Sequence, residues 1–501
     1  DDISQIRPIL PQLLDEFFAL MNEVESEEMV FTLETIVEKF GEEIAPYAMG
    51  MTQNLVAAFW KLNGSQDQTD EDDFTGALAS VGCLRAIATI LESLSALPHM
   101  YAQLEPALMP IMRKMLGADG YDVYEEVLEI LSYMTYYAPA VSPAMWELWP
   151  VLISALDGEY GVQYFENILV PMDNYISRGT ETFLAHPTCK GDVLRVASGV
   201  LLNNDIPEPE MLPAPKLLEC VLQNCKGRVD DCVAPYLAVA LERLKTCELT
   251  YLKDLLIQIV ANCLWYNAAL TLDILVKNGA LGTALQTWFG MLNDRTRKGG
   301  NKRKHHRREH DKKVCILGLV ALIQTPAQSL PAEVAAGMGQ ICAAVVSLLV
   351  DLREQEKERK EFEAKHPGGF YGWGSDEEDF GGDEDLGDDD EEEEELDHAE
   401  LEAMAKRATA VNPYRRRTGD EDDDEDDEDF DDGMLTDDEN FTSPIDDVDP
   451  FVLFAETVHA TQSTDAQRFQ ALAGGLDATG QQTLQELVAY APTRREELAK
   501  K

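Results

Sequence analysis

The chain has 501 residues, and 45% of them are hydrophobic, so it can bury sizeable cores but is too long to fold around a single one. It carries 93 acidic and 41 basic residues, for a formal net charge of −52. Such a charge repels duplex DNA and anionic membranes and attracts basic proteins, which argues against specific nucleic-acid binding and membrane insertion.

Apolar residues recur at helical spacing from the first residues to about residue 365. Leu84, Ile87 and Leu91 fall on one helical face, whereas alternating strand patterns are nearly absent. Candidate helices span residues 4–23, 27–40, 46–63, 74–95, 98–116, 121–137, 143–156, 161–177, 190–203, 213–225, 231–246, 248–265, 267–278, 280–293, 311–324 and 331–362. Two helices recur about every 40 to 45 residues, a period typical of HEAT or armadillo repeats. We therefore predict an all-α solenoid superhelix over residues 1–365, because each helix pair can bury its apolar face only against its neighbours.

Three further features of this region carry expectations. Pro106 and Pro110 should break or kink the helix that contains them. The chain opens inside a helical pattern and without a methionine, so we expect a fragment whose N-terminal part is missing. The longest apolar run, residues 314–323, is shorter than the roughly 18 to 20 residues of a membrane helix, and no signal peptide is found. Both observations again argue against membrane insertion.

The nine cysteines lie mostly within apolar helical patterns, and none forms a C-x-x-C pair. This distribution predicts reduced core thiols in an intracellular protein rather than a disulfide framework. Cys220, Cys225 and Cys232 are close in sequence, but their spacing matches no zinc site. We expect these three to be core thiols as well.

A basic loop, residues 295–313, separates two of the candidate helices and holds ten basic and two acidic residues. Three interpretations remain open: a solvated insertion, a nucleic-acid contact or nuclear localisation signal, and an intramolecular partner of the acidic tract that follows in the same chain. His305, His306 and His310 lie among these cations, and we expect them to be solvated rather than bound to a metal.

An acidic low-complexity segment follows, over residues 366–450. Between residues 376 and 449 there are 36 acidic and 5 basic residues. We predict that this segment is disordered, because it cannot bury enough apolar area to offset the entropy of ordering it. Its glycine- and aromatic-rich start, residues 368–382, fits either a flexible linker or a short linear motif.

The candidate functional residues lie in this acidic segment. The proposed cargo-binding residues are Asp388, Asp389, Asp390, Glu391, Glu392, Glu393, Glu394, Glu395, Asp422, Asp423, Asp424, Asp426 and Asp427. Ser375 and Thr436 have an acidic residue three positions on, as acidophilic kinases prefer, and are candidate phosphorylation sites.

Helical spacing returns over residues 451–501. Phe451, Phe454 and Val458 fit one helical face, and two more short amphipathic patterns follow. Three short helices seldom stand alone, so we expect this C-terminal module to dock on the solenoid.

Catalytic motifs are absent from the sequence. There is no phosphate-binding G-x-x-x-x-G-K-[ST], no G-x-G-x-x-G, no H-E-x-x-H and no G-x-S-x-G. The sequence therefore predicts no catalytic residue, no metal site and no cofactor, and a protein that is not an enzyme.

Several stretches resemble nuclear import receptors of the importin-β superfamily. They are VSPAMWELWPVL (141–152), YFENILVPMDNYI (164–176), CKGRVDDCVAPYLAVALERL (225–244), KKVCILGLVALI (312–323) and residues 448–488. Their order is similar to that of the C-terminal half of the importin seven and importin eight class, and the resemblance covers nearly the whole chain. The basic loop is longer and more basic than this pattern, so the resemblance assigns it no role.

The resemblance implies a carrier that shuttles between nucleus and cytoplasm through the nuclear pore. Expected partners are basic cargo proteins such as ribosomal proteins or histones, phenylalanine–glycine nucleoporins, the GTPase Ran, chiefly through the missing N-terminal half, and importin-β as a further candidate. The alternative is an acidic chaperone for histones or other basic proteins, or a HEAT-repeat assembly scaffold, without a transport cycle. On either hypothesis, the acidic segment would engage basic proteins through many weak contacts.

Overall fold

The computed structural model describes residues 44–63, 73–158, 161–295, 303–365 and 443–499, together with scattered positions between Ile9 and Ile36. Helices dominate these ranges, and the β-type pairing found in them is one isolated antiparallel bridge between Arg295 and Arg303. The predicted all-α class is thus confirmed. The chain divides into two compact units, Asp1–Tyr266 and Asn267–Lys501.

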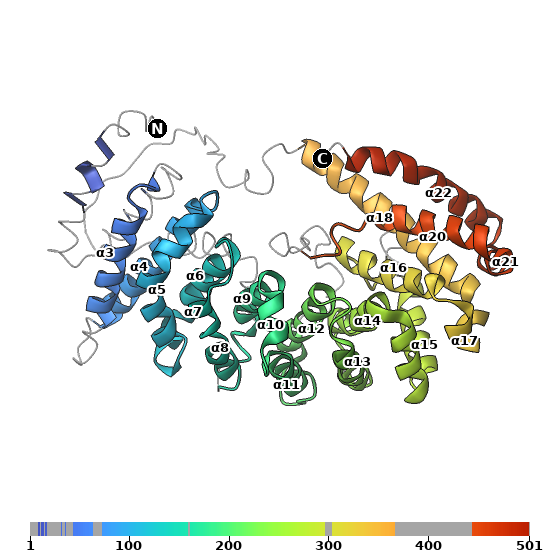
Figure 1. The fold of residues 1–501 in the computed structure, drawn as a ribbon, viewed down its shortest axis with the longest axis horizontal. Helices are drawn as coiled ribbons and strands as arrows, with labels where there is room; N and C mark the ends of the chain where they lie inside the picture. Colours follow the sequence, from blue (N-terminus) through green and yellow to red (C-terminus); the bar gives the residue numbers. More distant parts are fainter. Residues whose placement is uncertain are drawn as a thin grey trace, which may run out of the picture. The chain divides into compact units, whose positions relative to one another are not determined.

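The first unit is a stack of helix pairs (Figure 1). Its elements are α3 (Ala48–Asn63), α4 (Asp73–Ser93), α5 (Pro98–Met115), η4 (Ala118–Val123), α6 (Tyr124–Tyr136), α7 (Pro143–Trp146), α8 (Trp149–Leu156), α9 (Phe165–Arg178), α10 (Thr180–Ala185), α11 (Cys189–Leu201), η5 (Glu208–Met211), α12 (Pro213–Asn224), α13 (Asp230–Leu244) and the first part of α14 (Thr250–Lys277). Contacts run from α4 to α6, α9 and α12 in one row, and from α8 to α11 and α13 in the other. Two parallel rows of this kind are the arrangement of a HEAT-like solenoid.

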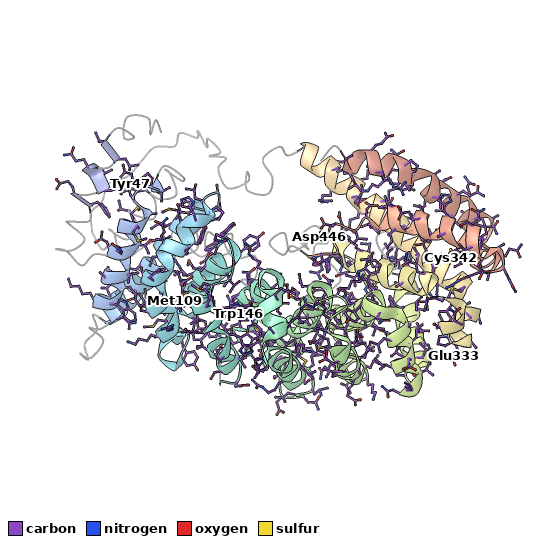
Figure 2. All side chains as sticks on the ribbon, viewed as in Figure 1. Tyr47, Met109, Trp146, Glu333, Cys342 and Asp446 are labelled. Atoms are coloured by element: carbon purple, nitrogen blue, oxygen red, sulfur yellow. The ribbon has the colours of Figure 1, made fainter. Side chains whose placement is uncertain are left out.

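Aromatic side chains fill the space between the two rows of the first unit. Trp146, labelled in Figure 2, lies on α7 with its ring 4.9 Å from that of Tyr175 on α9. Trp149 lies 5.7 Å from Tyr175 and 5.9 Å from Phe183, and all three side chains are at most 1% exposed. Such edge-on ring contacts stabilise the core beyond the area that they bury.

The second unit contains the rest of α14, then α15 (Leu281–Asn293), α16 (Glu309–Gln324), η6 (Ala327–Ser329), α17 (Ala332–Ala336), α18 (Met338–Lys365), α20 (Pro450–Thr464), α21 (Ala466–Gly474) and α22 (Ala478–Leu498). The long α16 and α18 pack on each other. Helix α20 lies on α16, whereas α21 and α22 lie on α18, so the three C-terminal helices cover this pair (Figure 1).

Helix α5 departs from the prediction at its two prolines. It runs through Pro106 and Pro110 without a break, so that part of the expected break or kink was wrong. The prolines are four residues apart and both are exposed. The carbonyl groups that lose a hydrogen-bond partner therefore lie on the solvent-exposed side of the helix, where water can donate hydrogen bonds to them.

Helix α14 joins two helices that the sequence predicts separately. Its backbone is non-helical at Asn267, where the two units divide. The Asn267 side chain accepts a hydrogen bond from the Leu270 amide at 3.1 Å, as an N-cap residue does, and so starts the second segment.

By length and composition alone, α14 could cross a membrane. The structure instead makes it a core helix of the first unit. Asp254, Gln258 and Asn262 are at most 3% exposed, and Asn262 accepts a hydrogen bond of 2.9 Å from Gln223 on α12. Polar groups that are buried and hydrogen-bonded within the protein are typical of a packed interior.

The cysteines agree with the predicted core thiols. All nine are buried and none forms a disulfide. Burial raises the pKa of Cys83 to about 12, so its thiol stays protonated and inert at neutral pH. Within the described ranges, no group of three metal-binding side chains comes together.

Candidate functional site

The acidic candidates between Asp388 and Asp427, together with Ser375 and Thr436, lie outside the described residues. The structure does describe the two points at which the folded chain borders the acidic segment. Helix α18 ends at Lys365, and the description resumes at Ser443 in a turn that leads to α20. This turn and the helices around it form the candidate site.

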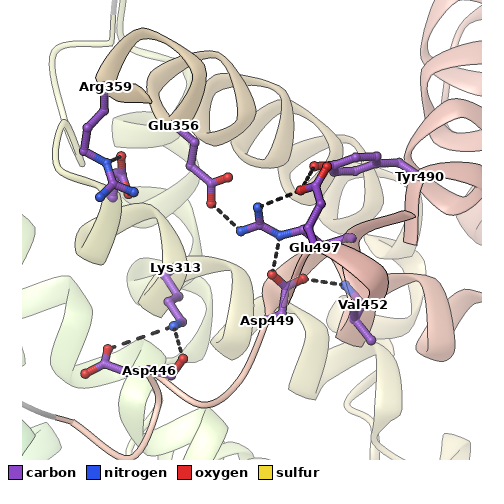
Figure 3. A network of polar contacts seen from close by, with 10 residues as sticks. Lys313, Glu356, Arg359, Asp446, Asp449, Val452, Tyr490 and Glu497 are labelled. Atoms are coloured by element: carbon purple, nitrogen blue, oxygen red, sulfur yellow. Dashed lines mark hydrogen bonds and ion pairs between the residues drawn. The ribbon is translucent and has the colours of Figure 1, made fainter. Parts of the chain in front are cut away.

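An anchor network holds the turn and the C-terminal helices to α16 and α18 (Figure 3). We define it as Lys313, Glu356, Asp446, Asp449 and Arg494. At its centre, Arg494 of α22 donates to Asp449 and to Glu356 of α18, each at 2.7 Å. These three side chains are only 8 to 12% exposed. Because both carboxylates share one guanidinium, the start of α20, the end of α22 and α18 are joined at one point.

Asp449 also begins α20. Its other carboxylate oxygen accepts the Val452 amide at 2.9 Å, which makes it the N-cap residue, and Pro450 follows in the first turn. An N-cap carboxylate satisfies an amide that the helix cannot. One side chain therefore both starts the helix and fixes it to Arg494.

Lys313 of α16 attaches the turn itself. Its Nζ donates to the Asp446 carbonyl at 3.2 Å and lies 4.0 Å from the Asp446 carboxylate. Burial lowers the pKa of Lys313, and the carboxylates of Asp446, Asp449 and Glu356 oppose that shift. For Arg494, burial acts in the same sense, but its bonds to Asp449 and Glu356 prevail and raise its pKa. The network is thus held by ionised groups that are largely buried from solvent.

The described part of the basic loop is folded into the protein. Arg303 is 7% exposed and donates to Asp351 of α18, to the Ser347 hydroxyl at 2.7 Å and to the Leu292 carbonyl at 2.6 Å. Arg295 reaches the same Asp351 at 3.0 Å. For these residues, the solvated-insertion hypothesis is therefore wrong.

Most of the residues after Arg303 are buried or half-buried, although Lys304 is exposed. Arg308 pairs with Asp311 at 3.0 Å, and the two form a capping box at the start of α16. Lys312 donates to Gln355 of α18 at 2.5 Å. His305 is 7% exposed and His306 is fully buried with a left-handed backbone, so the expected solvation of these two histidines was wrong. The engaged cations, Arg303, Arg308 and Lys312, are not available to contact phosphates, which disfavours the nucleic-acid hypothesis for these three residues. Residues 296–302 lie outside the described ranges.

A second acidic feature lies in the first unit, on α4 and α6. We call it the Glu129 cluster, consisting of Glu92, Glu126, Glu129, Arg85 and Tyr133. Arg85 pairs with Glu126 at 3.1 Å, and the Tyr133 hydroxyl donates to Glu129 at 3.3 Å. Burial, followed by repulsion from Glu126, raises the pKa of Glu129 to about 7. A carboxylate in this state would gain from a nearby positive charge.

Comparison with known proteins decides the family. The family model for importin-11-like proteins with TPR repeats matches residues 85–407, well over half of the chain. The chain belongs to the importin-β family. Members of this family are transport receptors, not enzymes.

The similar proteins carry importin names. An importin beta-like SAD2 homolog from Arabidopsis thaliana is 46% identical over all of this chain and 47% of its own length. A probable importin-7 homolog from Dictyostelium discoideum is 31% identical over 72% of this chain and 33% of its own length. Human importin-8 is 26% identical over 98% of this chain and 45% of its own length.

This importin-family chain thus spans about half the length, or less, of the curated relatives it matches. No solved structure matches it. Sequence reasoning missed both the anchor network and the Glu129 cluster. The only local signal for the anchor was the D-P pair at residues 449–450, which is typical of a helix start.

Proposed function

We propose that this importin-family chain acts within a nuclear transport receptor that binds basic proteins and shuttles between nucleus and cytoplasm. The observation that carries the proposal is a dense acidic segment bordered on both sides by folded structure. It has 36 acidic residues between positions 376 and 449, it follows α18, and its last carboxylates include Asp446 and Asp449 of the anchor network. The importin names of the relatives support the transport role.

The chemistry of the segment fits a reversible carrier. Each exposed ion pair contributes roughly 0 to 1 kcal/mol, so no single contact holds a basic protein for long. Many such pairs on one tether add up through effective concentration, and the field of the segment speeds the encounter. A basic cargo is then neutralised and shielded from RNA, yet can still leave.

The Glu129 cluster supports the same class of partner independently of the segment. Glu129, whose pKa burial raises to about 7, would regain its charge beside a lysine or arginine of a cargo. Because it lies in the first unit, the chain would offer a basic protein a folded contact as well as the acidic segment.

Binding assays on the full-length receptor test the proposal. A transport receptor should bind phenylalanine–glycine repeats and release a bound basic protein when GTP-loaded Ran is added. If basic proteins bind but neither response occurs, the chain is instead an acidic chaperone or scaffold. Failure to bind basic proteins at low salt would contradict both alternatives.

A further inference from the structure

Ser443 combines a recognisable modification motif with an unusual position. It is followed directly by Pro444 and carries Asp446 three positions on, features that proline-directed and acidophilic kinases select. It also lies near the C-terminal end of the acidic segment, where its amide donates to Asp446 of the anchor network. The sequence analysis singled out Ser375 and Thr436 and missed this serine.

The backbone around Ser443 is a turn held by short-range hydrogen bonds. The Ser443 amide donates to the Asp446 carboxylate at 2.7 Å, and its hydroxyl accepts the Ile445 amide at 3.3 Å. The Asp446 amide donates a hydrogen bond to the Ser443 carbonyl at 2.9 Å. Such bonds contribute about 0.5–1.5 kcal/mol each, so the turn can open into the extended form that a kinase binds without unfolding a helix.

A phosphate at this position would meet an excess of negative charge. Asp446, Asp447 and Asp449 follow Ser443 within six residues, and the Asp446 carboxylate itself accepts the Ser443 amide. The cations near these three carboxylates are already engaged, because Lys313 binds the Asp446 carbonyl and Arg494 binds Asp449. Phosphoserine adds about 1.5 to 2 further negative charges at neutral pH, and it would sit beside the Asp446 carboxylate that closes the turn.

We propose that Ser443 is a phosphorylation site and that its phosphorylation loosens the turn and the attachment of α20 to α16. In the reaction, the Ser443 oxygen bonds to the γ-phosphorus of a nucleoside triphosphate. The bond from that phosphorus to the bridging oxygen breaks, the nucleoside diphosphate leaves, and the hydroxyl proton is released. Repulsion then opens the turn and exposes Ile445, which is 2% exposed in the closed form.

In the closed form, the turn fixes the C-terminal end of the acidic segment to the folded unit. Once the turn opens, Lys313 loses the Asp446 carbonyl that it binds in the closed form, and this end of the segment is no longer fixed to α16. The inference goes beyond the proposed function, since it requires neither a basic cargo nor a transport cycle.

The test uses the full chain, treated with ATP and a proline-directed kinase, with phosphosites mapped by mass spectrometry. We expect phosphate on Ser443 and about tenfold faster hydrogen exchange at the Asp446 and Val448 amides, which are bonded within the turn. The Ser443→Ala chain, treated identically, should show no change there.

Three outcomes would overturn the proposal. The first is phosphate on other serines or threonines while Ser443 stays unmodified. The second is a modified Ser443 with unchanged or slower exchange at those two amides. The third is faster exchange that persists in the Ser443→Ala chain, because the cause would then be another phosphate.

Discussion

Arg494 gathers the polar contacts of the C-terminal helices into one side chain. Besides Asp449 and Glu356, its guanidinium lies 5.4 Å from the centre of the Phe451 ring. Taking charges out of water is costly, so this cluster adds little stability compared with an apolar core of the same volume. Removing one partner is strongly destabilising, because it leaves the opposite charge buried and unpaired.

Replacement of Arg494 by alanine should therefore lower the free energy of unfolding of the second unit by about 3–5 kcal/mol, since two buried carboxylates lose their cation. Denaturant unfolding would measure the change. Arg495→Ala is the matched control: its pair with Glu456 is more than half exposed on both sides and should cost about 0–1 kcal/mol. Equal losses in the two variants would show that the network is not a structural centre.

Glu129 should make the first unit less stable as the pH rises. Its pKa is about 7 in the folded protein against an ordinary value of 4.5, so the folded state binds the proton more tightly than the unfolded state. Stability from this group is present below pH 4.5 and is lost as the pH rises through 7. Glu129→Gln removes the penalty and should stabilise the protein at pH 8 by about 1 kcal/mol, a figure reduced for partial exposure.

Unfolding in urea at pH 8 and near pH 4.5 would check this difference. The variant should be more stable than the native chain at the higher pH and equal to it at the lower. Tyr133 can still donate to the glutamine carbonyl, so the local hydrogen bond is kept. The same stability difference at both pH values would mean that the charge of Glu129 is not the cause.

Buried cations illustrate what the sequence could not reveal. The density of charge in residues 295–313 pointed to solvent, yet Arg303 pairs with Asp351, 48 residues further on. Charge counting finds local runs, whereas a distant carboxylate becomes a partner only once α18 has packed on α16. The acidic candidates stay predictions, because they lie outside the described residues.

At the scale of the elements, α18 and α21 cross at two glycines. A side-chain carbon placed on Gly339 would lie 2.6 Å from the Gly475 Cα atom, and one placed on Gly475 would collide with Gly339 in turn. The backbones of the two helices therefore touch at this point. Glycine is required here for close approach rather than for its backbone freedom.

Gly475→Ala should separate the two helices and lower the free energy of unfolding by about 1–3 kcal/mol, the usual cost of overpacking. The adjacent Gly474→Ala is the matched control, because a side chain there meets nothing within 4 Å. It should be neutral or slightly stabilising, since alanine favours the helix. Thermal unfolding of the two variants would be compared, and a neutral Gly475→Ala would contradict the close contact.

The helices themselves were more predictable than the points at which a helix is or is not interrupted. Most ends agree with the apolar spacing within a few residues, as at α9 and α13, because helical periodicity is written in the local sequence. The two helices predicted over 248–265 and 267–278 agree with the two segments of α14 that meet at Asn267, whereas the absence of a break in α5 was missed. Whether a proline stops a helix depends on which side of the helix faces water and on what packs against it, and both are set by tertiary structure.

For the whole molecule, the decisive property is where the charge sits. The acidic segment is bordered by α18 on one side and by the anchor network on the other. A charged segment attached at both ends has a higher effective concentration near its attachment points than one attached at a single end. We therefore expect the charge of the segment to dominate the attraction of basic partners.

Deletion of residues 383–432 removes 26 acidic and 5 basic residues while keeping the anchor network. We expect the affinity for a basic protein to fall about tenfold at low salt and its salt dependence to flatten, because the lost contacts are exposed ion pairs. The thermal midpoint should be unchanged, since α18 and α20 keep their contacts.

Titration calorimetry at two salt concentrations would measure both effects. A second variant of full length, with every Asp and Glu of residues 383–432 replaced by Asn and Gln, separates charge from chain length. If charge is what binds, this variant should behave like the deletion. Native affinity in either variant would show that the acidic segment does not engage basic proteins. The Glu129 cluster of the first unit would then have to account for any binding that remains.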